Sequence, residues 1–317
     1  SFMLLGIAFL YAYTGTLSFD GTMPTQLEHG NLALSPLLLS LGCLLFFSGL
    51  AFKVSLVPFH YWTPDVYVGA PTPVTLMLAT ISKLAIFTAL LKCCFSPLFS
   101  EYFLQPQMYS TFAGLALLSM IIGNALALKQ KEVKRILAYS SIAHMGYLMV
   151  LVFVASNNSI SLAWQTTIFY FVAYILATVS MFYLLCHCEQ NSGADGVNSA
   201  EFSGLFWRSP KDAVLMMLSL LSLAGIPLTA GFIGKFYLIS FASYHALWLL
   251  LGAIILGSAI SLAYYLPLIF KLFEKAEVET EIKSVNLTSV TLVYSLIIAT
   301  LYLGVLPGRF TSFLAWL

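Results

Sequence analysis

The chain has 317 residues, of which 60% are hydrophobic and only 9% are charged, and its mean hydropathy is +0.92. A soluble globular domain carries roughly 25% charged residues, so this composition excludes an ordinary water-soluble enzyme. The formal net charge of +1 gives no reason to expect nucleic acid as a partner. The five cysteines form no CxxC pair, and the sequence therefore predicts neither a disulfide framework nor a zinc site. The composition is typical of a polytopic membrane protein.

Long apolar runs divide the chain into nine predicted membrane crossings. A bilayer core of about 30 Å takes about 20 apolar residues per helical crossing, whereas a transmembrane barrel would show shorter alternating segments. We therefore expect an all-α membrane protein, with a transmembrane domain over residues 1–306 and a short C-terminal tail over 307–317. In chain order, the predicted crossings are Phe2–Phe19, Leu32–Val57, Pro73–Leu91, Tyr109–Leu128, Ile136–Ser156, Ile160–Cys186, Ala213–Ala246, Leu247–Phe270 and Val285–Leu306.

The start of the chain is unlike a signal peptide. Ser1 leads directly into an apolar run, without a basic region or a small-residue cleavage site. We therefore expect the sequence to be a fragment that lacks its N-terminal part.

Basic residues are distributed unevenly over the predicted loops. Cytoplasmic loops of membrane proteins carry an excess of Lys and Arg. When the loops between predicted crossings are numbered in chain order, the odd-numbered loops and the C-terminal tail carry only Lys92 and Arg309. We therefore expect the even-numbered loops to be cytoplasmic and Leu317 to lie outside. The even loops carry nine basic residues, which are Lys129, Lys131, Lys134, Arg135, Arg208, Lys211, Lys271, Lys275 and Lys283.

Three lysines fall inside predicted crossings, where an ionised lysine is energetically unfavourable. Lys83 is the eleventh of the nineteen residues 73–91 and the only charged residue among them. An ionised lysine at the bilayer centre costs at least about 2.5–3.5 kcal/mol, so it must face the protein interior or water, or lose its proton. A lysine in this position is therefore a candidate for carrying protons.

Lys53 and Lys235 lie in runs that are too long for one straight crossing. Residues 32–64 and 213–246 contain no other charged residue, apart from two histidines. Both runs contain helix breakers: Pro58 after Lys53, and Gly225, Pro227, Gly231 and Gly234 before Lys235. We predict that each run is one crossing made of two half-helices. Irregular backbone at membrane depth is tolerated only inside protein or beside water, and paired discontinuous helices are typical of repeat-built transporters.

Structural alternatives exist for these lysines. Lys53 would extend to the membrane surface if its helix ended at Val57. Lys235 would be a structural charge if a carboxylate paired with it, although every Asp and Glu lies in a loop or at a helix end. We place the missing counter-charge in the absent N-terminal part.

Two histidines are further candidates for proton transfer. Ser140, Ser141, His144 and Tyr147 are spaced so that they share a helix face in the sequence ILAYSSIAHMGYL, where a histidine can pass protons near neutral pH. His144 can equally be a structural histidine between helices. His60 follows the predicted break at Pro58. It could act as a proton relay or be an interface residue.

Three long motifs carry a resemblance to a known family. The sequences FKVSLVPFHYWTPDVYVGAPTPVTLMLATISKLAIF (52–87), KRILAYSSIAHMGYL (134–148) and SLAGIPLTAGFIGKFYL (222–238) resemble the antiporter-like membrane subunits of respiratory complex I. The resemblance covers essentially the whole chain, and LFWRSP (205–210) fits the bacterial form.

The resemblance implies a fold and a set of functional residues. The family has fourteen helices in two inverted five-helix repeats, of which this chain would supply part of the sixth through the fourteenth. Lys53 matches the proposed proton-loading site, Lys83 the link between the two half-channels, and Lys235 the outlet side. His60 and His144 match polar positions on the family's hydrophilic axis. The family's glutamate that pairs with the first lysine, and a further lysine near the start of the sixth helix, are absent here, so the fragment alone is not expected to pump.

The resemblance also implies the setting of this function. A proton-translocating subunit would move protons through the lysines while quinone is reduced elsewhere in the complex. NADH, FMN, iron–sulfur clusters and quinone would all be held by other subunits, with no cofactor or redox site in this chain. The expected partners are other membrane subunits of complex I and the lipid bilayer of the bacterial inner membrane, and a stand-alone homo-oligomer is not expected.

Two other functions remain open from the sequence. One is a subunit of a multisubunit cation/proton antiporter, which needs no redox partner. The sequence of residues 52–87 argues against it, because such antiporters resemble other complex I subunits more closely. The other is a structural helix bundle whose lysines hold lipid or neighbouring subunits.

Overall fold

The computed structural model describes residues 1–17, 35–96, 99, 106–153, 157–192, 199–274 and 287–314. Within these ranges the regular structure is helical, which confirms the predicted all-α class. The longer helices are α1 (Phe2–Thr14), α2 (Ser35–Val54), α5 (Ile81–Phe95), α7 (Pro106–Ala127), α8 (Val133–Leu148), α9 (Asn157–Ser192), α11 (Pro210–Ala224), α12 (Ala230–Tyr244), α13 (Trp248–Phe273) and α14 (Leu287–Val305). Shorter elements are α3 (Trp62–Gly69), α4 (Thr72–Ala79), η1 (Met149–Val152), η2 (Ser199–Phe202), α10 (Leu205–Arg208) and α15 (Pro307–Leu314).

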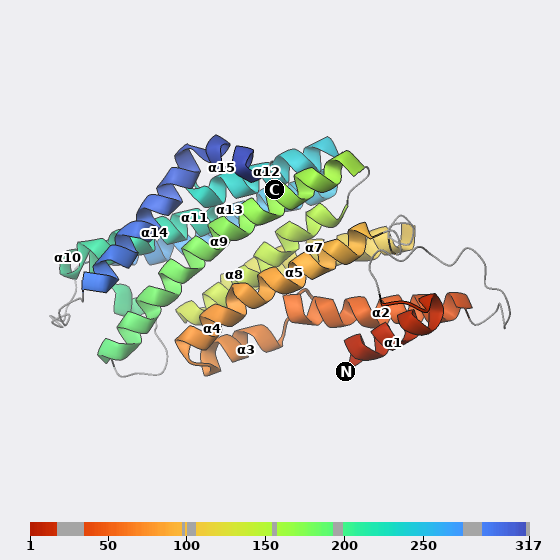
Figure 1. Cartoon of the computed structure of the whole chain (residues 1–317). Helices are drawn as coiled ribbons and strands as arrows, with labels where there is room; N and C mark the ends of the chain where they lie inside the picture. Colours follow the sequence, from red (N-terminus) through yellow and green to blue (C-terminus); the bar gives the residue numbers. More distant parts are fainter. Residues whose placement is uncertain are drawn as a thin grey trace.

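The helices form an elongated bundle, and α9 crosses the face that Figure 1 draws. Figure 1 shows α9 running diagonally between the group of α11 to α15 and the group of α4, α5, α7 and α8, with α1 and α2 beyond. α8 is the most enclosed helix, since every residue from Ser140 to Leu148 is buried. The bundle therefore has its polar α8 at the centre.

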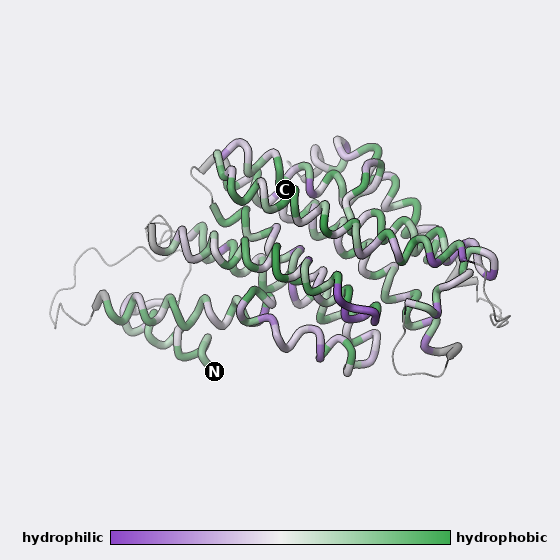
Figure 2. The backbone as a smooth tube through the Cα atoms, turned by 180° about the vertical axis from the view of Figure 1, so that it is seen from behind, coloured by the Kyte–Doolittle hydropathy of each residue, from purple (hydrophilic) through white to green (hydrophobic). Residues whose placement is uncertain are grey.

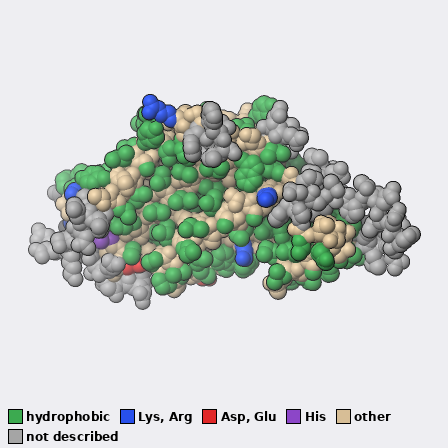
Figure 3. Space-filling model, in the orientation of Figure 1, with side chains coloured by type: hydrophobic (Ala, Val, Ile, Leu, Met, Phe, Trp, Pro, Cys, Tyr) green, Lys and Arg blue, Asp and Glu red, His purple; other side chains and the backbone are tan. Residues whose placement is uncertain are grey.

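Apolar side chains cover most of the visible surface. Figure 2 shows many hydrophobic residues (green) along the helices. Figure 3 shows few charged side chains on the face that it draws. Six elements are long and apolar enough to cross a membrane, and Phe2–Thr14 and Thr291–Val305 are shorter apolar helices. The six are Leu37–Val54, Thr72–Phe95, Met108–Ala127, Val133–Val152, Ile160–Glu189 and Trp248–Phe273. The chain is a multi-pass membrane protein, and the count of nine crossings stays a prediction.

Both predicted discontinuous helices are present. α2 ends at Val54 and α3 begins at Trp62, and Ser55 between them has a left-handed φ of 69°. Side chains satisfy the backbone at this break: the indole of Trp62 donates to the Phe52 carbonyl at 2.9 Å, and Ser119 accepts from the Val57 amide at 3.0 Å. The second break separates α11 from α12.

Three boundaries differ from the predicted ones. The predicted crossing Pro73–Leu91 is interrupted, because α4 ends before Thr80 and α5 begins after it. α8 begins at Val133, so that Lys134, which hydropathy placed in a loop, is a buried helical residue. Residues of the predicted tail form α15, whose Phe310 ring packs against Phe169 of α9.

Gly231 is required where α12 returns toward α11. A Cβ atom added to Gly231 would overlap the Ser222 carbonyl, whereas one added to Gly252 of α13 would meet no atom within 4 Å. We expect Gly231→Ala to lower the stability of the protein by about 1–3 kcal/mol through overpacking. Gly252→Ala is the matched control, because removing a glycine from a helix stabilises it by about 0.5–1 kcal/mol. Thermal unfolding in detergent checks this, and equal melting temperatures for the two variants would contradict it.

Candidate functional site

Lys83 is enclosed between α5, α8 and α3. Its side chain has 0% exposure, and its ammonium group donates to the Ser141 hydroxyl at 2.8 Å. Ser141 in turn donates to the Ala138 carbonyl at 2.7 Å, so its oxygen is free to accept. The ammonium also lies 5.8 Å from the centre of the Tyr67 ring, within cation–π range. Lys83 is therefore solvated by a hydroxyl and a ring, and within the described ranges no carboxylate contacts it.

Lys235 is solvated by the second helix break. Its ammonium donates to the Ala224 carbonyl at 2.7 Å and lies 5.4 Å from the centre of the Tyr147 ring. Ala224 is the last residue of α11, where carbonyl groups lack intrahelical partners and carry the negative end of the helix dipole. Gly225 ends α11 with a left-handed φ of 83°, and a Cβ atom there would come 2.7 Å from Cδ of Lys235. The break thus supplies both the space and the oxygen for this lysine.

His144 lies on α8, three residues after Ser141, and contacts α9. Its Nδ1 shares a hydrogen bond of 2.6 Å with the Tyr170 hydroxyl, and its ring centre is 5.2 Å from that of Tyr174. His144 is 5% exposed and lies within electrostatic range of both Lys83 and Lys235. The structure therefore brings together three of the five predicted site residues.

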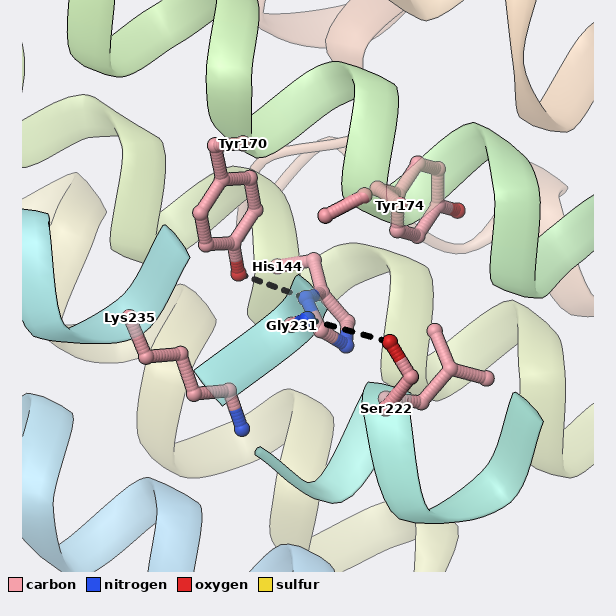
Figure 4. A pocket seen from close by; sticks show the side chains of 8 residues that line it. His144, Tyr170, Tyr174, Ser222, Gly231 and Lys235 are labelled. Atoms are coloured by element: carbon pink, nitrogen blue, oxygen red, sulfur yellow. Dashed lines mark hydrogen bonds between the residues drawn. The ribbon is translucent and has the colours of Figure 1, made fainter. Parts of the chain in front are cut away.

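A small cavity separates His144 from Lys235. In Figure 4, the Tyr170 hydroxyl points at His144, and the Lys235 side chain extends toward the α11–α12 break. The volume of the cavity is about 10 Å³, which is room for about one water molecule. The lining residues are His144, Tyr170, Ala173, Tyr174, Ser222, Leu223, Gly231 and Lys235.

The polar residues of α8 face two sides, not the single side that their spacing predicted. Ser141 and His144 contact α5 and α9, as described above. On another side, Ser140 bonds to the Tyr265 hydroxyl of α13, and Tyr147 accepts from the Asn124 amide of α7 at 2.8 Å. The Tyr264 hydroxyl donates to the oxygen of that amide at 3.0 Å. These contacts hold the Tyr147 ring next to the Lys235 ammonium group. Asn124 was not among the predicted site residues, because a single asparagine in an apolar helix forms no recognisable pattern.

Lys53 and His60 lie apart from this site. The Lys53 side chain is exposed at the end of α2, and it makes no hydrogen bond or ion pair in the part of the chain that the structure describes. Of the three lysines in predicted crossings, the structure thus places Lys83 and Lys235 in buried positions and Lys53 in an exposed one. His60 is buried in the first break, where its Nδ1 has no hydrogen-bond partner among the described residues.

Comparisons with known proteins agree with this architecture. A family described as NADH:quinone oxidoreductase/Mrp antiporter, TM, matches residues 1–261. The chain is similar to NADH-quinone oxidoreductase subunit N of Methylococcus capsulatus, with 41% identity over 88% of this chain and 55% of the relative. It is 45% identical to the subunit N of Ectopseudomonas mendocina, over 86% of this chain and 53% of the relative. The chain thus spans about half the length of the curated relatives it matches.

Solved structures show the same fold. A chain of the respiratory complex I from Thermus thermophilus with bound aureothin aligns with a TM-score of 0.79 and 35% identity, over 98% of this chain and 65% of that chain. A chain of the Mrp complex from Dietzia sp. aligns with a TM-score of 0.82 over 99% of this chain and 64% of that chain, but at 19% identity it shows the fold alone. Because the family match covers most of the sequence, the resemblance read from the three motifs is confirmed, and the chain belongs to the NADH:quinone oxidoreductase/Mrp antiporter transmembrane family.

Proposed function

We propose that the chain is part of a proton-translocating membrane subunit of a bacterial NADH:quinone oxidoreductase. Its relatives named subunit N and its likeness to a chain of a respiratory complex I support this assignment. The other membrane subunits of that complex are then its partners in the inner membrane. NADH, FMN, iron–sulfur clusters and quinone belong to the other subunits.

One observation carries the proposed proton pathway. Lys83 and Lys235 are both buried in the apolar bundle, and neutral oxygens alone accept from their ammonium groups within the described residues. The charged form of such a lysine is costly, and no fixed negative charge holds the proton in place. Each lysine can therefore gain and lose a proton as the surrounding charges change.

The path between the lysines runs along α8 and α9. A proton leaving Lys83 passes to the Ser141 hydroxyl, whose own proton leaves the Ala138 carbonyl and turns toward His144, three residues further along α8. Protonated His144 then delivers a proton to neutral Lys235 through the Tyr170 hydroxyl and one water in the cavity. Histidine suits this middle position because one ring nitrogen can accept a proton while the other donates one.

Lys53 and His60 enter the proposal through the family resemblance. Lys53 would load protons opposite a carboxylate outside the described residues, and its exposed side chain leaves room for that partner. The unpartnered Nδ1 of buried His60 is available for a bound water next to the break. The excess of basic residues in the even loops supports a C-terminus on the outer side.

Replacing either buried lysine tests the relay. We expect Lys83→Ala and Lys235→Ala in the intact complex to lower proton pumping by about 10²-fold, since a positioned proton carrier contributes at least that much. Coupled quinone reduction should fall with it. Proton uptake by inverted membrane vesicles measures the effect, and Lys129→Ala, which changes an exposed lysine after α7, is the control. Normal pumping by both variants would make the relay assignment wrong.

The assignment to a redox-driven complex has its own test. Membranes are solubilised gently, separated on a native gel, stained for NADH oxidation and probed for this chain. We expect the chain to migrate with a large NADH-oxidising band, because its proposed partners hold the redox centres. A small band without this activity would favour a multisubunit cation/proton antiporter, whose fold the chain also shares.

A further inference from the structure

The structure contains a second polar cluster around a buried lysine, Lys134, which the relay described above does not use. Nζ of Lys134 lies 2.6 Å from Oε1 of Glu189, and the Thr72 hydroxyl donates to Oε2 of the same carboxylate. The three residues begin α8, end the membrane span of α9 and begin α4. Figure 1 shows these three helix ends together at one end of the bundle.

The cluster shares α8 with the Lys83 site and lies on the same side of that helix. On α8, Lys134 precedes Ser141 by seven residues, which places both on one face, about 10 Å apart along the helix. On α9, Glu189 follows Thr178 and Tyr174 on one face. The ion pair is therefore one layer of polar contacts, and the Lys83–Ser141 contact is the next layer inward.

A buried hydroxyl lies beside the inner of the two layers. Tyr67, whose ring contacts Lys83, has a fully buried hydroxyl without a hydrogen-bond partner among the described residues. Thr75 of α4 and Thr178 of α9 are also buried. An unsatisfied buried hydroxyl is the kind of group that an ordered water satisfies, and the proposal below places one water beside Tyr67.

Stability does not explain the ion pair. Removing two charges from water costs more than their attraction returns in many proteins, and apolar side chains of similar size serve as well. The exposure of the two partners differs: the Lys134 side chain is 4% exposed and that of Glu189 is 20% exposed. The Glu189 side chain is thus partly exposed while that of Lys134 is buried. This asymmetry suits a group that takes up protons from outside.

We propose that Glu189 and Lys134 form the proton inlet of the relay, on the side of the basic loops. A proton from the aqueous phase binds the Glu189 carboxylate, which neutralises it and releases its ion pair with Lys134. The carboxylic acid then gives a proton to water beside Tyr67, and the water delivers a proton to the neutral amine of Lys83. The carboxylate is restored and pairs with Lys134 again. The proposal rests on the proton-translocating function proposed above.

A charge-neutral double variant tests the inlet. Lys134→Met with Glu189→Gln removes both charges together, so no unpaired charge is left buried and the protein can fold. The amide oxygen of the glutamine still accepts from Thr72. We expect the complex to assemble and oxidise NADH, with the protons pumped per NADH oxidised reduced by about tenfold. Glu189→Asp alone keeps the acid and should retain most of the pumping.

Matched controls separate this proposal from the others. Glu132 and Arg135 form a neighbouring, more exposed ion pair at 3.3 Å, and Arg135→Met with Glu132→Gln should pump normally. If the Lys134/Glu189 double variant pumps like the unchanged protein while Lys83→Ala does not, the inlet is wrong and the relay stands. Normal pumping by both would remove the relay as well. Loss of the assembled complex in the double variant, or weak pumping by Glu189→Asp, would assign the pair a structural role and overturn the inlet.

Discussion

An ammonium group inside an apolar helix bundle needs oxygen atoms to solvate it, and this requirement organises the structure around α8. In a helix, nearly all backbone carbonyls are already bonded, so the oxygens must come from hydroxyl side chains or from helix ends. Ser141 meets the requirement for Lys83, and the end of α11 meets it for Lys235. The polar side chains of α8 and the break before α12 are two solutions to the same problem.

The second break therefore does more than bend a helix. Ending α11 at Ala224 frees a carbonyl at the negative end of a helix dipole, and the glycine that follows leaves space for the lysine stem. An unbroken helix would bind that carbonyl internally, and a residue with a Cβ would collide with the stem. Lys235 and Gly225 are thus one unit, and the position of the lysine depends on the geometry of the break.

Much of this arrangement could be predicted, because its signals are local. Pro58 and the Gly225–Pro227 segment marked both breaks, and the central position of Lys83 marked a buried charge. The features that were missed depend on contacts distant in sequence. Thr80 interrupts a helix without any glycine or proline nearby, and Lys134 is read as a loop residue unless its pairing with Glu189 is known. Lys53 resembles the other two lysines in sequence, yet apolar surfaces that face lipid and protein look alike, so its exposure could not be foreseen.

The lysines differ in what solvates them, and this difference separates their roles. Lys83 and Lys235 have neutral oxygen partners, which do not fix a charge, so either protonation state can be accommodated. Lys134 has a carboxylate partner, with which it forms an ion pair. A proton that neutralises Glu189 changes the field around α8 without touching the two inner lysines. A site with a carboxylate, followed by two lysines with neutral partners, can pass a proton inward and restore itself, because Glu189 pairs with Lys134 again once its proton has moved on.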